Sequence, residues 1–285
     1  MSPHAISLPG DGLTLMATSY GSPADPAVVL LHGGGQTRHA WSSAGRALAD
    51  ASRHAICVDL RGHGDSDWSV DGEYSIDRFA ADIRSVVESL DGSPVLVGAS
   101  LGGLAAMVAV AESERDIATA LVLVDVAPRV EELGSKRIRD FMARGIDGFD
   151  SLADAARAIT EYLPDRPPPK PPGGLRKNLR LVDGRWHWHW DPRFIHGPQA
   201  EAAQKSYLDH ARFARAAARL SLPVLLVRGQ MSDVVTEAGA RELQQLVPHA
   251  EVVDVAGAGH MVAGDRNDVF NEAVIDFIRR RGGSQ

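Results

Sequence analysis

The chain has 285 residues, enough for one large domain or for a domain that carries a substantial insertion. Hydrophobic residues make up 44% and charged residues 24%, the balance of a globular protein rather than of a disordered chain. The net charge is −7 and no basic stripe is present, which argues against a nucleic-acid partner. A single cysteine, Cys57, excludes an internal disulfide and suits a reducing compartment.

The N-terminal segment lacks the positively charged and apolar regions of a secretory signal. The longest uncharged run, 92–111, has the length of a membrane span, but it is interrupted by residues that are typical of a strand, a tight turn and a helix: Pro94, Gly98, Ser100, Gly102 and Gly103. We therefore expect a cytoplasmic protein without a membrane partner.

In the first 130 residues, short apolar runs alternate with amphipathic stretches. Strands are predicted at 13–20, 27–31, 55–59, 94–97 and 120–124. Helical spacing of apolar residues predicts a helix from Ser75, as N-cap, to Leu90, and a second helix is expected over 101–111. Strands that alternate with helices favour parallel pairing, with helical crossovers on both faces of a sheet.

The pattern breaks after Pro128 and returns near residue 221. Between these points, helices are expected at about 135–146, 151–162 and 199–219, and six prolines within 164–174 predict a stiff connector. Strands then follow at 223–227 and 250–254, with helices at 236–246 and 267–280. We predict an α/β core formed by 1–128 and 221–285, which encloses a helical cap at 129–220.

One serine lies at a turn between a predicted strand and a predicted helix. The segment 98–102 reads G-A-S-L-G, which matches the pattern G-x-S-x-G around Ser100. A sharp strand-to-helix turn exposes such a serine as a nucleophile, and the flanking glycines remove side chains that would clash there. Leu101 follows the serine directly and offers a backbone N–H for an oxyanion. A second N–H is expected from the glycine loop after the 27–31 strand, at Gly34.

A serine hydroxyl needs a base and an acid that orients the base. His260 follows the last predicted strand, and Asp233 follows the strand that ends at Val227, so both are expected at the same edge of the sheet as Ser100. Asp125, which follows the 120–124 strand, is the alternative acid; its other interpretation is a residue that anchors a loop.

These motifs together resemble the α/β-hydrolase superfamily, in its branch similar to epoxide hydrolases and cofactor-free haloperoxidases. The matching segments are 30–35, 59–66, 98–103 and 257–260. The resemblance implies an eight-stranded, mostly parallel sheet flanked by helices, with a cap inserted after the sixth strand. Epoxide hydrolases and dehalogenases use an aspartate where this chain has Ser100, so those two activities are disfavoured.

Other histidines and aromatic residues have simpler interpretations. His32 and His63 are expected to hold their glycine-rich loops. In the segment 185–190, strand alternation places His187 and His189 on one face and three tryptophans on the other. No third ligand is evident nearby, so we expect an aromatic cap segment and no metal site.

The sequence thus predicts a serine hydrolase that cleaves an ester-type bond of a small, mainly apolar molecule, as a carboxylesterase or lactonase, without a cofactor. Carbon–carbon bond hydrolysis or perhydrolysis by the same triad is the alternative, and a ligand-binding receptor is the alternative outside enzymology. Trp41, Trp186 and Trp188 are expected to line the substrate pocket. A preference for carboxylated substrates would instead point to Arg38 or to another arginine in the pocket. Oligomeric state does not follow from the sequence.

Overall fold

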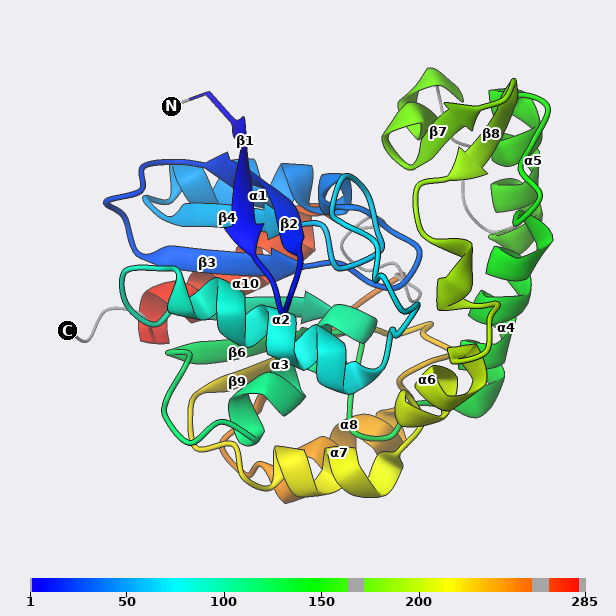
Figure 1. The fold of residues 1–285 in the computed structure, drawn as a ribbon. Helices are drawn as coiled ribbons and strands as arrows, with labels where there is room; N and C mark the ends of the chain where they lie inside the picture. The colour runs from blue at the N-terminus through cyan, green and yellow to red at the C-terminus, as the bar shows by residue number, and fades with distance from the viewer. Residues whose placement is uncertain (1, 164–171, 258–266, 282–285) are drawn as a thin grey trace.

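The computed structural model describes residues 2–163, 172–257 and 267–281, and these form an eight-stranded sheet with helices on both faces (Figure 1). The strand order is β1-β2-β4-β3-β5-β6-β9-β10. β2 pairs antiparallel with β1 and with β4, whereas the other neighbouring strands are parallel. The predicted eight-stranded, mostly parallel sheet is confirmed.

The central strands of the sheet are buried on both faces, which explains their continuous apolar sequences. β1 is a largely exposed edge strand with little apolar alternation, and the sequence analysis did not predict it. The strands of the sheet are β1 (His4–Pro9), β2 (Thr14–Tyr20), β3 (Ala27–Leu31), β4 (His54–Val58), β5 (Val95–Ala99), β6 (Ala120–Val124), β9 (Val224–Gly229) and β10 (Glu251–Val255).

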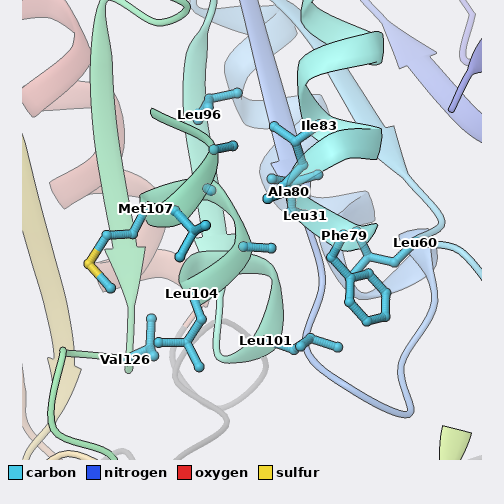
Figure 2. Packing of buried hydrophobic residues seen from close by; sticks show 14 of the residues in the cluster. Leu31, Leu60, Phe79, Ala80, Ile83, Leu96, Leu101, Leu104, Met107 and Val126 are labelled. Atoms are coloured by element: carbon cyan, nitrogen blue, oxygen red, sulfur yellow. The ribbon is translucent and has the colours of Figure 1, made fainter. Parts of the chain in front are cut away.

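Side chains of each central strand alternate between two apolar layers. In β3, Val29 and Leu31 pack in the layer of α2 (Ile76–Glu88) and α3 (Leu101–Ala111). Figure 2 shows Leu31 and Leu96 of the sheet together with the side chains of these two helices that belong to the same cluster. Val28 and Leu30 face the opposite layer, which contains α1 (Ser42–Asp50) and α10 (Asn267–Arg281). The sheet is therefore the middle layer, and its polar loops gather at the strand ends.

The segment between β6 and β9, where the sequence analysis expected a helical cap, is not purely helical. A hairpin of two antiparallel strands, β7 and β8, lies within it. The expected helix at 199–219 is divided into two, because the Asp209 carboxylate accepts the Arg212 N–H at 2.9 Å and starts a new helix. The elements are α4 (Glu132–Arg144), α5 (Leu152–Tyr162), η2 (Pro172–Lys177), β7 (Leu179–Val182), β8 (Arg185–Trp188), η3 (Pro192–Phe194), α6 (Ala200–Ser206) and α7 (His210–Ala217).

Two further expectations differ from the structure at the edges of the insertion. α7 packs against α3 and α8 (Glu237–Leu246), which are helices of the core layer, although the predicted cap extended to residue 220. Of the predicted connector, 164–171 lie outside the described residues, and the chain from Pro172 forms a 3-10 helix instead of a stiff, extended connector. Within the described ranges, no helix is both long and apolar enough to span a membrane.

Candidate active site

Ser100 lies on a sharp turn between β5 and α3, as the sequence predicted. Its φ is 47° and its ψ is −117°, a combination that side chains rarely adopt and that recurs at functional sites. A Cβ atom at Gly98 would lie 2.5 Å from the Gly103 Cα, and one at Gly102 would lie 2.6 Å from the Leu31 carbonyl oxygen. Only glycine fits these two positions, so the flanking glycines allow the turn that exposes the serine.

The glycine loop after β3 lies beside Ser100, since a Cβ atom on Gly33 would be 3.3 Å from the Ser100 Cβ. The Gly33 N–H donates to the Gln36 Oε1 at 3.0 Å. The Gly35 N–H donates to the His63 Nε2 at 3.1 Å. In the described part of the chain, the third glycine amide, that of Gly34, has no acceptor.

The amide of Leu101 also has no acceptor among the described residues, because it opens α3 and precedes the intrahelical hydrogen bonds. Leu101, Gly34 and Ser100 all line one cavity. The two amides predicted to stabilise an oxyanion are therefore available at the cavity beside the serine.

His32 and His63 are buried and tie the glycine loop to the loop after β4. The His32 Nδ1–H donates to the Gly33 carbonyl at 2.8 Å, and its Nε2 accepts the Leu60 N–H at 3.0 Å. In the same way, the His63 Nδ1–H donates to the Arg61 carbonyl at 2.9 Å, and the His63 Nε2 accepts the Gly35 N–H. Burial lowers the pKa of His32 to about 4 and that of His63 to about 3, so both rings are neutral near pH 7. Both are structural, as expected.

Arg38 also holds these two loops together. The buried Asp59 carboxylate accepts the Arg38 backbone N–H at 2.6 Å and pairs with its guanidinium, which also contacts Asp65 at 2.7 Å. Arg38 is not among the residues that line the cavity. Its charge is compensated by two carboxylates, so Arg38 is not the pocket arginine that the sequence analysis considered.

A cavity of about 420 Å³ opens over Ser100. It is lined by Ser100 and the glycine loop, by residues at the ends of β5 and β6, and by residues of α4, α5 and the segment 188–207. The lining is mostly aliphatic and aromatic, as in many small-molecule sites. Residues of the segment between β6 and β9 therefore line the same cavity as the serine.

The predicted aromatic wall is partly correct. Trp41 and Trp188 line the cavity, as does Trp190. Trp186 does not: it lies under the Arg176 guanidinium, 5.1 Å from the ring centroid, and its backbone pairs with Phe149. The prediction for Trp186 requires correction, because these contacts hold it away from the pocket.

The two candidate acids lie in different environments. Asp125 is fully buried, has a φ of 47°, and accepts the Gly229 N–H at 3.0 Å and the Ser232 hydroxyl at 2.5 Å. The Asp233 side chain is 46% exposed and contacts the Arg137 guanidinium at 3.1 Å. Asp125 is the shielded acid and Asp233 the exposed one.

Asp125 and Ser100 follow directly after two neighbouring strands of the sheet, β6 and β5. Val124 is the register partner of Ala99, and its carbonyl accepts the Ser100 N–H at 3.1 Å. Asp125 is the next residue after Val124. His260 lies outside the described residues, so the structure gives no contact between it and either acid.

A serine and a histidine outside this site lie within hydrogen-bond distance of each other. The Ser19 hydroxyl lies 2.8 Å from the His54 Nε2. His54 begins β4, whereas Ser100 follows the carboxyl end of β5, and neither Ser19 nor His54 lines the cavity. This pair is therefore separate from the site. Within the described ranges, no three His, Cys, Asp or Glu residues are arranged to hold a metal ion.

The sequence analysis missed one face of α4 as part of the site. Ser135, Ile138, Arg139 and Met142 follow the spacing i, i+3, i+4 and i+7, and all four line the cavity. This periodicity is visible in the sequence, but only the position of the helix over Ser100 shows what its inner face contacts.

Comparisons with known proteins agree with this geometry. A family model for the alpha/beta hydrolase fold matches residues 26–266. The esterase Rv0045c of Mycobacterium tuberculosis is 32% identical over 273 residues, which cover 93% of this chain and 85% of that protein. The sn-1-specific diacylglycerol lipase ABHD11 of Mus musculus is 30% identical over 262 residues, which cover 89% of this chain and 81% of that protein.

A solved structure shows the same fold over the whole length. The structure of E-2-(acetamidomethylene)succinate hydrolase has a TM-score of 0.83 at 24% sequence identity, and the alignment covers 98% of this chain and 100% of that one. The family match runs from the start of β3 to residue 266 and includes the serine turn and the segment between β6 and β9. The chain belongs to the α/β-hydrolase fold family and is a hydrolase.

Proposed function

We propose that this protein is a serine esterase that acts through an acyl-enzyme. The observation that carries the proposal is the position of Ser100, on a strained turn that lines a mostly apolar cavity, with two cavity-lining residues whose amides have no acceptor among the described residues. The relatives named as an esterase and as a diacylglycerol lipase support an ester as the substrate class.

In the proposed reaction, the Ser100 oxygen attacks the acyl carbon while His260 takes the hydroxyl proton. The amides of Gly34 and Leu101 stabilise the negative charge on the carbonyl oxygen. His260 then protonates the leaving alcohol, and the bond between the acyl carbon and the alcohol oxygen breaks. Water, deprotonated by His260, hydrolyses the acyl-enzyme and releases the acid and free Ser100.

For the acid that orients His260, the geometry favours Asp125 over the predicted Asp233. A carboxylate that stabilises an imidazolium ion acts most strongly when it is shielded from water, and Asp125 is buried whereas Asp233 is exposed. The loop 229–232, which donates two hydrogen bonds to Asp125, lies next to the end of β10, from which the chain continues to His260. We therefore propose Ser100, His260 and Asp125 as the triad.

We further propose that the core of 1–128 and 221–285 supplies the chemistry, and that the cap of 129–220 selects the substrate, in a cytoplasmic enzyme. The cap supplies most of the aromatic residues of the cavity wall. The substrate is a small molecule, because the cavity has the size of a small-ligand site.

Labelling and turnover test the proposed activity. The protein is expected to hydrolyse p-nitrophenyl butyrate, and a fluorophosphonate is expected to modify Ser100 alone, at one label per chain, as located by peptide mass spectrometry. Turnover with label on a different serine would contradict the proposed nucleophile. Binding of the ester without hydrolysis or labelling would identify a receptor on this fold instead.

The cap wall has its own test in two neighbouring tryptophans. Trp188→Ala enlarges the cavity, so kcat/KM should shift towards longer acyl chains in a series from acetate to decanoate, with each buried methylene contributing about 0.8 kcal/mol. Trp186→Ala is the matched control, because Trp186 lies outside the cavity lining. Equal chain-length profiles in the two variants would exclude Trp188 from substrate selection.

A further inference from the structure

Arg139 is the one charged side chain among the described residues that line the cavity. It lies on the inner face of α4, between Ser135 one turn before it and Met142 one turn after it. The apolar periodicity of that face would place an aliphatic residue at this position, as it does at Ile138. An arginine there needs an explanation, since it introduces a guanidinium group into a lining that is otherwise mostly apolar.

The other charges near Arg139 on α4 are compensated within the protein. Lys136 pairs with Asp140 at 2.7 Å, and Arg137 pairs with Asp233 at 3.1 Å. Arg139 donates from one Nη1 to the Ser135 hydroxyl at 2.7 Å. In the described part of the chain it has no carboxylate partner, and no described acid lines the cavity.

A guanidinium carries five N–H donors in a planar fork that matches a carboxylate, and one neutral hydroxyl leaves most of them available. In an apolar cavity the attraction between opposite charges is stronger than in water. An incoming carboxylate would supply the negative charge that none of the described residues lining the cavity carries.

α4 also sets the position of this charge relative to the nucleophile. A Cβ atom on Gly35 would lie 3.0 Å from the Met142 Cε, so the end of the inner face contacts the glycine loop beside Ser100. Arg139 precedes Met142 by three residues, which is about 4.5 Å of helix rise. Arg139 and Ser100 therefore line the same cavity from two different elements, α4 and the turn before α3.

We infer that Arg139 binds a carboxylate group of the substrate, so that the ester cleaved by this enzyme carries an acid group away from the bond that breaks. This inference rests on the proposed esterase function and narrows it. It also modifies the expectation of a mainly apolar substrate: the lining of the cavity is mostly apolar, but Arg139 adds one cation that forms no ion pair with a carboxylate among the described residues.

Two substrates of equal size test the inference. p-Nitrophenyl monoadipate ends in a carboxylate, and p-nitrophenyl adipamate replaces it with a primary amide of the same shape. The wild type should prefer the monoadipate by about 10- to 100-fold in kcat/KM, mainly through KM, as expected for a hydrogen-bonded charge pair. Arg139→Gln should remove this preference by losing activity on the monoadipate, and Arg139→Lys should restore part of it.

Arg144→Gln is the matched control, because Arg144 is an exposed arginine on the same helix and does not line the cavity. It should keep the wild-type preference. Inhibition of the wild type by adipate and by adipamide gives a second readout that does not depend on any variant folding, and adipate should bind more tightly. Equal turnover of the two esters, with equal inhibition, would overturn the role of Arg139 and leave the esterase intact. Absence of turnover with every ester would instead contradict the proposed function.

Discussion

Replacing Ser100 with alanine is expected to lower kcat by about 10⁴-fold or more while the protein stays folded, because loss of the nucleophile removes most of the catalysis of a triad. Alanine should be accepted at this position, since the glycines at 98 and 102 relieve the steric crowding of the turn and the serine side chain makes no capping hydrogen bond. Steady-state hydrolysis of p-nitrophenyl butyrate gives kcat, and circular dichroism with thermal unfolding checks the fold.

The control for this variant is Ser19→Ala, which alters the serine–histidine pair outside the cavity. It should keep kcat within about twofold of the wild type, since most substitutions away from the site leave the chemistry unchanged. Hydrolysis by Ser100→Ala at the wild-type rate would show that another group is the nucleophile.

Asp125→Asn is expected to lower kcat by about 10³- to 10⁴-fold, because the neutral amide no longer stabilises the imidazolium of His260. Loss of this negative charge also lowers the pKa of His260, so the acidic limb of the kcat/KM profile should move to lower pH. If Asp125 only anchors the loop 229–232, Asp125→Asn would lower the free energy of unfolding without moving the acidic limb of the kcat/KM profile. The pH profile therefore separates a positioning acid from a structural one.

Asp233→Asn is the matched comparison, since it removes the same charge from the neighbouring loop. The exposed Asp233 pairs with Arg137, a kind of contact that contributes little, so we expect a change in kcat of about threefold or less. A loss of about 10³-fold or more in Asp233→Asn, with a small effect in Asp125→Asn, would restore the original assignment to Asp233.

Much of the core could be predicted because its signals are local. The apolar runs at 27–31 and 120–124 match β3 and β6 residue for residue, and 101–111 matches α3. The strained turn at Ser100 follows from glycines two residues away on each side, whose close contacts occur where strand and helix meet. β1 escaped prediction because an exposed edge strand carries little of the apolar alternation on which such a prediction depends.

The cap was predicted less well, since its segments depend on contacts with distant parts of the chain. The strand alternation of 185–190 correctly indicated a strand that includes Trp186 and Trp188. It could not tell which tryptophan meets the cavity, because Trp186 is held by Arg176 and Phe149 from other elements.

By itself, the sequence determined the α/β sheet and the sharp turn at Ser100, because each of these depends on residues close together in the chain. The same local signals led to the proposals of a cap after β6 and of two oxyanion amides. Tertiary structure decided which acid is shielded, which tryptophans reach the substrate, and that Arg139 faces the cavity without a carboxylate partner in the described chain. The spacing of apolar residues in the sequence shows which side chains share one face of a helix or strand. Burial and charge compensation are set by the elements packed against it, and these come from positions far away in the sequence.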